Sequence, residues 1–369
     1  MIGADLKGSP RTASVDVVTD LAALADFERA WRALAESREN AFISPEWFRA
    51  WLARQPGETA PWVVVVRDEE GLRGLLPLVI SLRERPRRLR FAGGPFGDYF
   101  HPVSAAQDEE TVAFAAANVL AQRKGDWSVI ILDNVDIAAQ WVVSLRRWSM
   151  RRLAAVEDHR EVLPYIDLSG ISSWDDYLAT RSRKFRAHLR RELRVLERDH
   201  AVRFRRTLSA AELTADVSAF LDLHERRWQT RGTSTLSRPG AHSALLNFAA
   251  AALDAGWLRL WFLEIDEQPI AAWFGWRIGQ RYAHYQSGLD PAWSRRSAGI
   301  VLLGRTIRDA IEEGAAQYDM LSGGEAYKQR FANGDRQTRT LVLTRAWHPV
   351  RVLATTSIAM RRVARRLRL

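Results

Sequence analysis

The segment from residue 282 to residue 331 constrains the fold more than any other part of the chain. It reads as an apolar strand, a basic turn that contains a glycine, an apolar stretch with helical spacing, a second short strand and a polar loop. A strand, a turn and a helix followed by a further strand are typical of an α/β arrangement. Polar residues at the loop ends of such strands are where α/β proteins place their functional sites.

The basic turn of this segment reads Trp293-Ser-Arg-Arg-Ser-Ala-Gly299 and directly precedes the helical stretch. Backbone N–H groups at a helix N-terminus, together with Arg295 and Arg296, favour binding of an anion. The same order of elements brings four further polar residues to the loop ends of neighbouring strands: His284, Asp319, Glu325 and Lys328. The sequence therefore predicts an anion site with a polar cluster beside it.

Two motifs in this segment resemble those of a known family. Arg296-Ser-Ala-Gly299 resembles most of the Gln/Arg-x-x-Gly-x-Gly/Ala signature of the GNAT acyltransferases, with Val301 in place of its last small residue. Asp319-Met-Leu-Ser-Gly-Gly-Glu-Ala-Tyr-Lys328 is similar to the Asp-x-Leu-x-Gly-x-x-x-Tyr-Lys pattern of the GNAT-like branch that includes cellulose-biosynthesis-associated acetyltransferases. That branch also resembles the FemAB-like, Fem-type aminoacyl transferases, which carry two GNAT-like units in tandem.

The resemblance implies an α/β (α+β) fold of tandem GNAT-like mixed β-sheets flanked by helices. It also implies an N- or O-acyltransferase that transfers an acyl group from acyl-CoA to an amine or a hydroxyl, in cell-envelope or polysaccharide biosynthesis. Acetyl is the expected acyl group, and acetyl-CoA is the expected donor. The family's pyrophosphate-binding turn carries over to six residues of this chain: Arg295, Arg296, Ser297, Ala298, Gly299 and Ile300. No metal is implied, and the eight histidines are scattered along the chain.

The family's acid–base chemistry carries over to the polar cluster. Asp319, Glu325 and His284 are the candidate general bases, in that order, and His284 has an ordinary pKa suited to neutral pH. Lys328 is expected to orient an anionic acceptor or a phosphate. Tyr285 or Tyr327 is expected to donate a proton to the leaving thiolate.

The order of strands and helices occurs twice, which predicts a tandem arrangement. The first copy lacks an Arg-x-x-Gly turn and is expected to be degenerate. We expect a connector from about residue 133 to 160, and four parts in all: an N-terminal GNAT-like unit at residues 1–160, a basic linker helix at 161–200, a catalytic GNAT unit at 201–347 and a basic amphipathic tail at 348–369.

Arginine dominates the charge of the chain, whose net value is +10. Residues 174–199 are expected to form one helix, capped by Ser172 and Ser173, with leucines on one stripe and arginines on the other faces. Such a helix favours phosphate-bearing partners. It keeps open two alternatives to an acyl-CoA enzyme: an aminoacyl-tRNA-dependent transferase, and a non-catalytic protein that binds nucleic acid or a membrane surface.

The expected cellular compartment and binding partners follow from sequence features that are absent as well as from the charge. It has no cysteine, no signal-like N-terminus and no apolar run of membrane-spanning length, so a cytoplasmic protein is expected. The tail at 348–369 could hold it at the inner face of an anionic membrane. A small molecule or a glycan- or lipid-linked molecule is the expected acceptor. Its identity, the acyl chain and the oligomeric state stay open.

Overall fold

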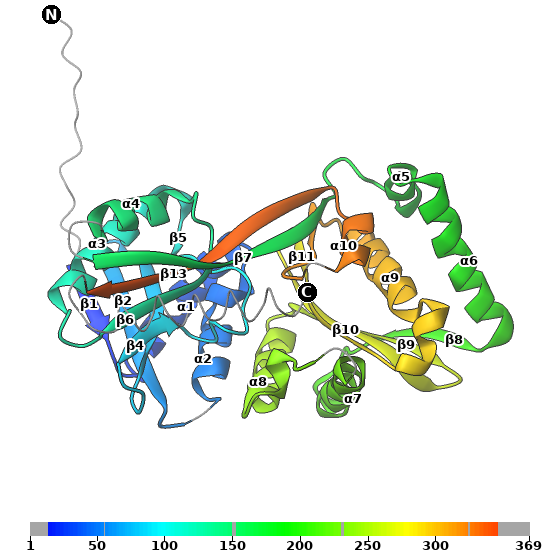
Figure 1. Cartoon of the computed structure of the whole chain (residues 1–369), viewed down its shortest axis with the longest axis horizontal. Helices are drawn as coiled ribbons and strands as arrows, with labels where there is room; N and C mark the ends of the chain where they lie inside the picture. The colour runs from blue at the N-terminus through cyan, green and yellow to red at the C-terminus, as the bar shows by residue number, and fades with distance from the viewer. Residues whose placement is uncertain (1–13, 55, 150–152, 230–231, 324, 346–369) are drawn as a thin grey trace, which may run out of the picture.

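The computed structural model describes residues 14–54, 56–149, 153–229, 232–323 and 325–345. Its strands form one 13-stranded sheet in the order β1-β2-β3-β4-β6-β13-β7-β12-β11-β10-β9-β8, with β5 beside β3. Figure 1 shows that this sheet is divided into two lobes joined by the long strands β7 and β13. The amphipathic tail expected at residues 348–369 lies outside the described residues.

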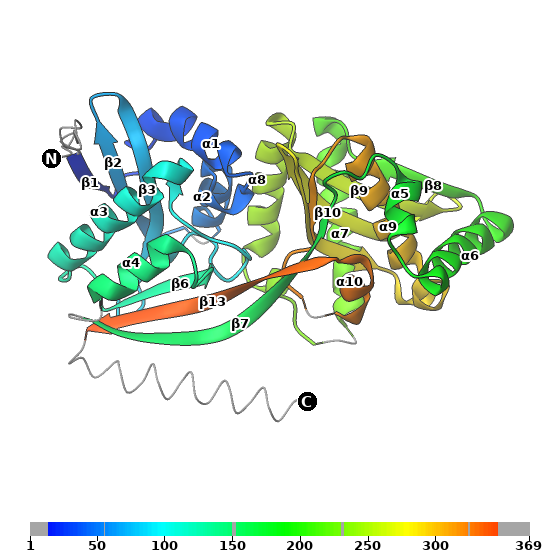
Figure 2. The same ribbon diagram turned by 90° about the horizontal axis from the view of Figure 1, so that it is seen from above.

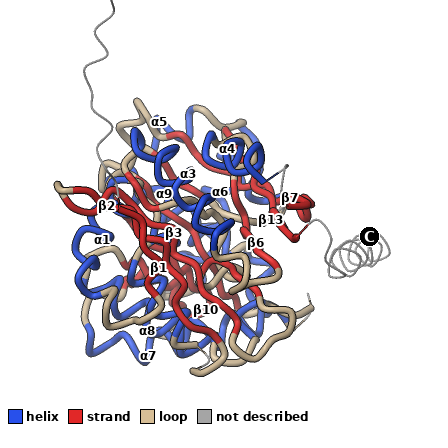
Figure 3. The backbone as a smooth tube through the Cα atoms, turned by 90° about the vertical axis from the view of Figure 1, so that its left-hand side faces the viewer, coloured by secondary structure: helices blue, strands red, loops and turns tan. Residues whose placement is uncertain are grey.

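The first lobe contains the elements up to α4. These are β1 (Ser14–Val18), α1 (Glu28–Ser37), α2 (Pro45–Leu52), β2 (Thr59–Asp68), β3 (Gly71–Ser81), β4 (Arg88–Phe91), β5 (Val103–Ser104), α3 (Glu109–Gln122), β6 (Val129–Val135) and α4 (Gln140–Ser149). Seen from its end, the strands form a layer with helices on both sides (Figure 3). Ser44 caps α2 by accepting from the Trp47 N–H at 3.2 Å, and Pro45 occupies the first position of that helix.

The second lobe begins after β7 (Leu153–Asp167). It contains α5 (Trp174–Ala179), α6 (Arg183–Asp199), β8 (Val202–Arg206), α7 (Ala210–Trp228), α8 (Ala241–Asp254), β9 (Leu258–Ile265), β10 (Gln268–Ile278), β11 (Arg281–Leu289), α9 (Ala298–Glu312), β12 (Gln317–Asp319), α10 (Ala326–Phe331) and β13 (Gly334–Arg345). The connector expected over residues 133–160 consists largely of regular structure, because the end of β6, α4 and the first half of β7 occupy it.

The single helix expected over residues 174–199 is wrong, because the chain breaks it at residues 180–182. Ser182 has extended backbone angles, and its hydroxyl accepts from the Phe185 N–H at 3.2 Å, which starts a new helix. The Arg186 guanidinium closes the break by donating to the carbonyls of Leu178, Ala179 and Arg181 at 3.2–3.4 Å. The basic helix is therefore α6 alone, with α5 as a separate turn before it.

Each lobe repeats one pattern of strand pairing. In the first lobe β4 runs parallel to β6, with α3 between them in sequence, and in the second lobe β11 runs parallel to β12, with α9 between them. All other pairs in the sheet are antiparallel. The pairs β4–β6 and β11–β12 are therefore equivalent positions of a tandem repeat.

The two lobes exchange their last strands. The distal part of β13 inserts between β6 and the first part of β7, with Leu343 opposite Ile130 and Ala155. The distal part of β7 inserts between β12 and the first part of β13, with Tyr165 opposite Asp319 and Gly334. Figure 2 shows β7 and β13 running side by side from one lobe to the other. The sheet of the first lobe is thus completed by β13, which follows the second lobe in the sequence. The sheet of the second lobe is completed by β7, which follows the first lobe.

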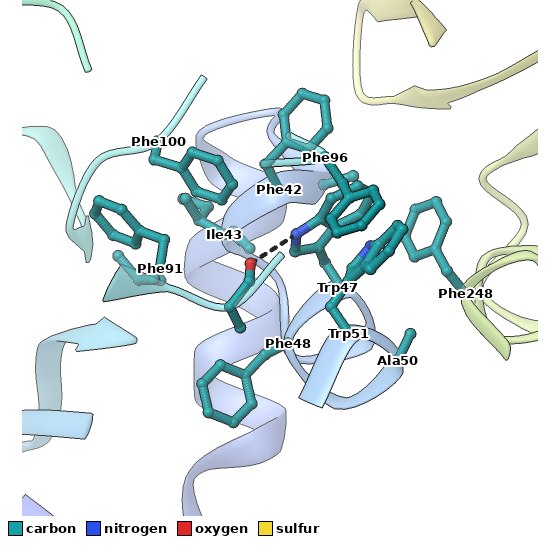
Figure 4. Close-up of a cluster of buried hydrophobic side chains, with 14 of the residues drawn as sticks. Phe42, Ile43, Trp47, Phe48, Ala50, Trp51, Phe91, Phe96, Phe100 and Phe248 are labelled. Atoms are coloured by element: carbon teal, nitrogen blue, oxygen red, sulfur yellow. Dashed lines mark hydrogen bonds between the residues drawn. The ribbon is translucent and has the colours of Figure 1, made fainter. Parts of the chain in front are cut away.

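An aromatic cluster joins the lobes beneath the loop that follows β4 (Figure 4). The Trp47 indole donates to the Ala92 carbonyl at 3.0 Å, and its ring meets Phe248 of α8 with centroids 5.2 Å apart. Trp51 stacks on Phe96 at 3.9 Å. One continuous apolar core includes residues from both lobes, so the loop at residues 92–102 is fixed against the second lobe.

Candidate active site

The sheet opens between β11 and β12. In the described structure β12 pairs with β11 over residues 281–283 alone, while β10 pairs with β11 as far as Leu289. The later half of β11 therefore presents an edge toward the opening. His224 and Arg227 of α7 donate to the Ser287 carbonyl at 3.0 and 3.3 Å and line this edge.

The basic turn lies where β11 meets α9. A short 3₁₀ helix (Pro291–Arg296) ends at Ser297, which has φ 54° and starts α9. The Ser297 N–H donates to the Ser294 carbonyl and the Ile300 N–H donates to the Ser297 carbonyl. The amides of Ala298 and Gly299 have no backbone acceptor within the described residues, as expected for the first turn of a helix. Two of the six predicted residues thus offer open N–H donors.

Gly299 leaves space in front of these donors. A Cβ placed on it would meet only the Leu289 side chain, at 3.9 Å. The protein's own packing therefore does not require glycine here, whereas the close approach of a ligand to the backbone would. Arg295 is exposed, and the Arg296 guanidinium lies 3.8 Å from the Asp199 carboxylate at the end of α6. Both arginines can turn toward an anion at the helix start.

Lys328 sits at the inner end of the opening. Its ammonium is buried and donates to the carbonyls of Met320 and Ser322 at 2.9 and 2.6 Å, with the Glu325 carboxylate 3.3 Å away. The two carbonyls accept from two of its three N–H donors, and the carboxylate balances its charge. Lys328 therefore holds the loop after β12 in place, whereas the sequence suggested a direct contact with an anionic acceptor.

Glu325 and His284 flank Lys328. Glu325 lies 3.6 Å from Arg227, and its Oε2 atom is enclosed without a hydrogen bond. The His284 Nδ1 atom is likewise enclosed without a partner. Burial, with added repulsion from Lys328 and Arg227, lowers the pKa of His284 well below its usual value, so this imidazole is neutral.

Asp319 and Tyr285 lie toward the first lobe. Asp319 is buried, accepts from the Leu321 N–H at 3.0 Å and is paired with Arg336 at 2.7 Å. The Tyr285 hydroxyl donates to the Phe96 carbonyl at 2.8 Å, and burial raises its pKa well above the usual range. The structure therefore places Lys328, Glu325 and His284 together. Asp319 and Tyr285 instead contact Arg336 and Phe96.

Asp98 is the site residue that the sequence did not reveal. It belongs to the Gly-rich loop of the first lobe, yet its carboxylate accepts from the Ser322 N–H at 3.3 Å. The residue keeps some surface exposed, but its carboxyl is enclosed, and burial raises the pKa to about 7 despite the attraction of Lys328. The local signal is the loop's glycine and aromatic composition, which fits a structural corner as well as backbone close to a ligand.

The equivalent position of the first lobe has the opposite charge. Its helix α3 begins with Glu109 and Glu110 after Asp108, and Glu109 is paired with Arg38 at 2.6 Å. Carboxylates at a helix N-terminus disfavour a bound anion there. The open, basic helix start belongs to the second lobe.

Two kinds of feature are absent from the described residues. They contain no helix long and apolar enough to cross a membrane. They also contain no group of three or more histidine and acidic side chains placed to hold a metal ion.

Comparison with known proteins agrees with this architecture. Residues 183–329 match the family described as an acetyltransferase (GNAT) domain. No curated protein matches the sequence. The crystal structure of FemX is similar over 92% of this chain and 99% of that chain, with a TM-score of 0.64 and 10% identity.

Two further crystal structures share the fold. The C-terminal domain of a protein assigned as a lysylphosphatidylglycerol synthetase, from Agrobacterium fabrum, has a TM-score of 0.57 at 12% identity, covering 91% of this chain and 96% of that one. A protein of unknown function from Bacteroides thetaiotaomicron has a TM-score of 0.55 at 11% identity, covering 90% and 100%.

The repeated lobes, the open edge of β11 and the basic helix start agree with the match of residues 183–329 to the acetyltransferase (GNAT) domain family. More particularly, the chain has the double-GNAT, FemAB-like fold, and its GNAT domain lies at residues 183–329.

Proposed function

We propose that the chain transfers an acyl group from acyl-CoA to an amine or hydroxyl acceptor, with the donor bound in the second lobe, at residues 201–347, and the acceptor deprotonated where the two lobes meet. The observation that carries this proposal is the open edge of β11 leading to the free amides of Ala298 and Gly299. An extended pantetheine arm can pair with such an edge as a strand would. Its pyrophosphate would then lie at the start of α9.

Asp98 is the general base in this proposal. A base works best when its pKa lies near the working pH, and the pKa of Asp98 is about 7. The Asp98 carboxylate takes the acceptor's proton as the acceptor nitrogen or oxygen attacks the thioester carbonyl, after which the carbon–sulfur bond breaks and CoA leaves as a thiolate. Neutral His284, with its much lower pKa, is a weaker base.

Lys328 positions the reacting groups through the backbone. It fixes the carbonyl of Ser322, whose N–H contacts Asp98. Removing the ammonium would release this loop and the contact between the lobes. We therefore assign Lys328 a positioning role. In this proposal other residues bind the charged group of the acceptor.

The direct test is calorimetric titration of the whole protein with acetyl-CoA and with CoA. We expect saturable binding of both. An acetyl-CoA titration without heat or saturation at millimolar ligand would refute the donor assignment.

A second candidate, an aminoacyl-tRNA-dependent transferase, is favoured by one observation. Arg183, Arg190 and Arg194 are exposed on α6, and the end of that helix reaches the basic turn through Asp199 and Arg296. A continuous basic surface of this kind suits a polynucleotide carrier of the acyl group. Acyl-CoA remains the first choice because one helix start and a few cations suffice to hold its phosphates.

A further inference from the structure

A cavity of about 470 Å³ lies apart from the opening, between the first lobe and the beginning of β11. This volume falls in the range of small-molecule sites. Its polar lining comes from both lobes: Arg38, Glu39, Tyr99, His101, Gln107 and Arg281. Nothing in the mechanism proposed above uses it.

Arg281 is the unusual member of this lining. Among the described residues its guanidinium has no hydrogen-bond acceptor and no ion-pair partner, and its Nε atom is enclosed. Its neighbour Arg336, by contrast, is paired with Asp319. Burial lowers the pKa of Arg281 from its usual value. A largely enclosed, unpaired guanidinium is unfavourable in an empty protein and is compensated when an anion binds to it.

The other charged groups of the cavity already have partners. Arg38 is paired with Glu109 at 2.6 Å, and Glu39 accepts from the Gln280 N–H at 2.6 Å. His101 donates from Nδ1 to the Pro102 carbonyl at 2.8 Å, and burial lowers its pKa to about 3. The imidazole is therefore neutral, and its Nε2 atom is an acceptor. The cavity therefore offers a guanidinium without a hydrogen-bonded partner, Arg281, near the Glu39 carboxylate, together with acceptors for hydroxyl or amino groups.

The cavity is close to the proposed base. Tyr99 directly follows Asp98 in the chain, and Arg281 shares one face of β11 with Tyr285, which contacts the Asp98 loop at Phe96. Tyr285 lies four positions after Arg281 along the strand, which corresponds to about 13 Å. A small molecule held at Arg281 could therefore extend toward Asp98.

We propose that this cavity binds the anionic end of the acceptor, a polar small molecule that carries a carboxylate or phosphate together with hydroxyl or amino groups. Its anion pairs with Arg281, and its hydroxyl or amino groups donate to His101 and Glu39. The acceptor role rests on the function proposed above, whereas the anion site itself does not.

The test is a calorimetric titration of the full chain with three matched probes: glucose 6-phosphate, glucuronate and glucose. We expect one or both charged sugars to bind and glucose to bind at least tenfold more weakly. The two charged probes separate a phosphate site from a carboxylate site. Arg281→Gln should lose about tenfold or more in affinity, since it removes a charge-assisted contact, and Arg281→Lys should lose less.

Arg308→Gln, on the outer face of α9, is the matched control and should bind as the parent does. Arg281→Gln should also melt at the same or a higher temperature than the parent, because it removes an unpaired charge. Equal binding of all three sugars, unchanged affinity in Arg281→Gln, or a clear fall in its melting temperature would overturn the site. If the charged sugars bind but acetyl-CoA does not, the anion site stands and the acceptor role fails.

Discussion

The carboxylate of Asp98, in the first lobe, accepts a hydrogen bond from the backbone N–H of Ser322, in the second lobe, across a separation of 224 residues. This contact places a carboxylate with a pKa of about 7 beside the loop that Lys328 holds. The first lobe, which lacks an open helix start of its own, thereby contributes to the site of the second.

Replacement of the proposed base should abolish most of the activity. Asp98→Asn keeps the shape of the side chain and its hydrogen bond from Ser322, but it cannot take a proton. We expect kcat to fall by about 100-fold or more, with acetyl-CoA affinity unchanged by calorimetry. Asp26→Asn, at an exposed position of the first lobe, is the control. An Asp98→Asn protein with parental kcat would eliminate Asp98 as the base.

The stability of the protein should depend on pH through the same carboxyl. Its pKa is raised by folding, from 3.8 to about 7, so the folded state keeps a proton that the unfolded state releases between these values. The parent should therefore lose stability relative to Asp98→Asn as the pH rises from 4 to 7. Denaturant titrations of both proteins across this range measure the difference. A constant difference would show that the pKa is not raised.

A carboxylate at the start of α9 should prevent donor binding without unfolding the protein. Gly299→Asp places a negative charge where the pyrophosphate is proposed to lie, and the site has space for the side chain. We expect a loss of acetyl-CoA affinity of at least about tenfold and an unchanged melting temperature. Gly125→Asp, at a glycine whose Cβ position is open, is the matched control. Parental affinity in Gly299→Asp would place the donor elsewhere.

Reversal of charge on α6 separates the two donor hypotheses. Arg183, Arg190 and Arg194 are exposed, whereas Arg186 closes the break before α6 and should be left intact. Changing the three exposed arginines to glutamate should leave acetyl-CoA affinity unchanged. Filter binding of tRNA across a salt series provides the second readout. Saturable, steeply salt-dependent tRNA binding that the triple variant abolishes would favour the aminoacyl-tRNA hypothesis.

Loss of the Tyr285 hydroxyl should loosen the loop that carries Asp98. Tyr285→Phe leaves the buried Phe96 carbonyl without its donor, which should destabilise the protein by about 1–3 kcal/mol. We expect kcat to fall as well, because Asp98 loses its fixed position. Denaturation and steady-state kinetics measure the two effects. Unchanged stability would mean that this hydrogen bond does not hold the loop.

Local features of the fold were readable in the sequence, and distant contacts were not. The α3 limits and the basic turn before α9 follow from periodicity, glycine and charge within a few residues. The break before α6 was missed because the Ser182 cap interrupts an apolar spacing that continues on both sides. Asp98 was missed because its partners Ser322 and Lys328 belong to the other lobe, and no local pattern encodes that contact.

The exchange of β7 and β13 has a consequence for how the chain acquires its shape. The sheet of the first lobe lacks an interior strand until residues 339–344 pair with β6, more than two hundred residues later. During synthesis, therefore, the first half cannot finish folding before the second half has emerged, and pairings of such long range form slowly. Cutting the gene between the lobes would yield two fragments with unpaired strand edges. Each fragment could complete its sheet only in the presence of the other.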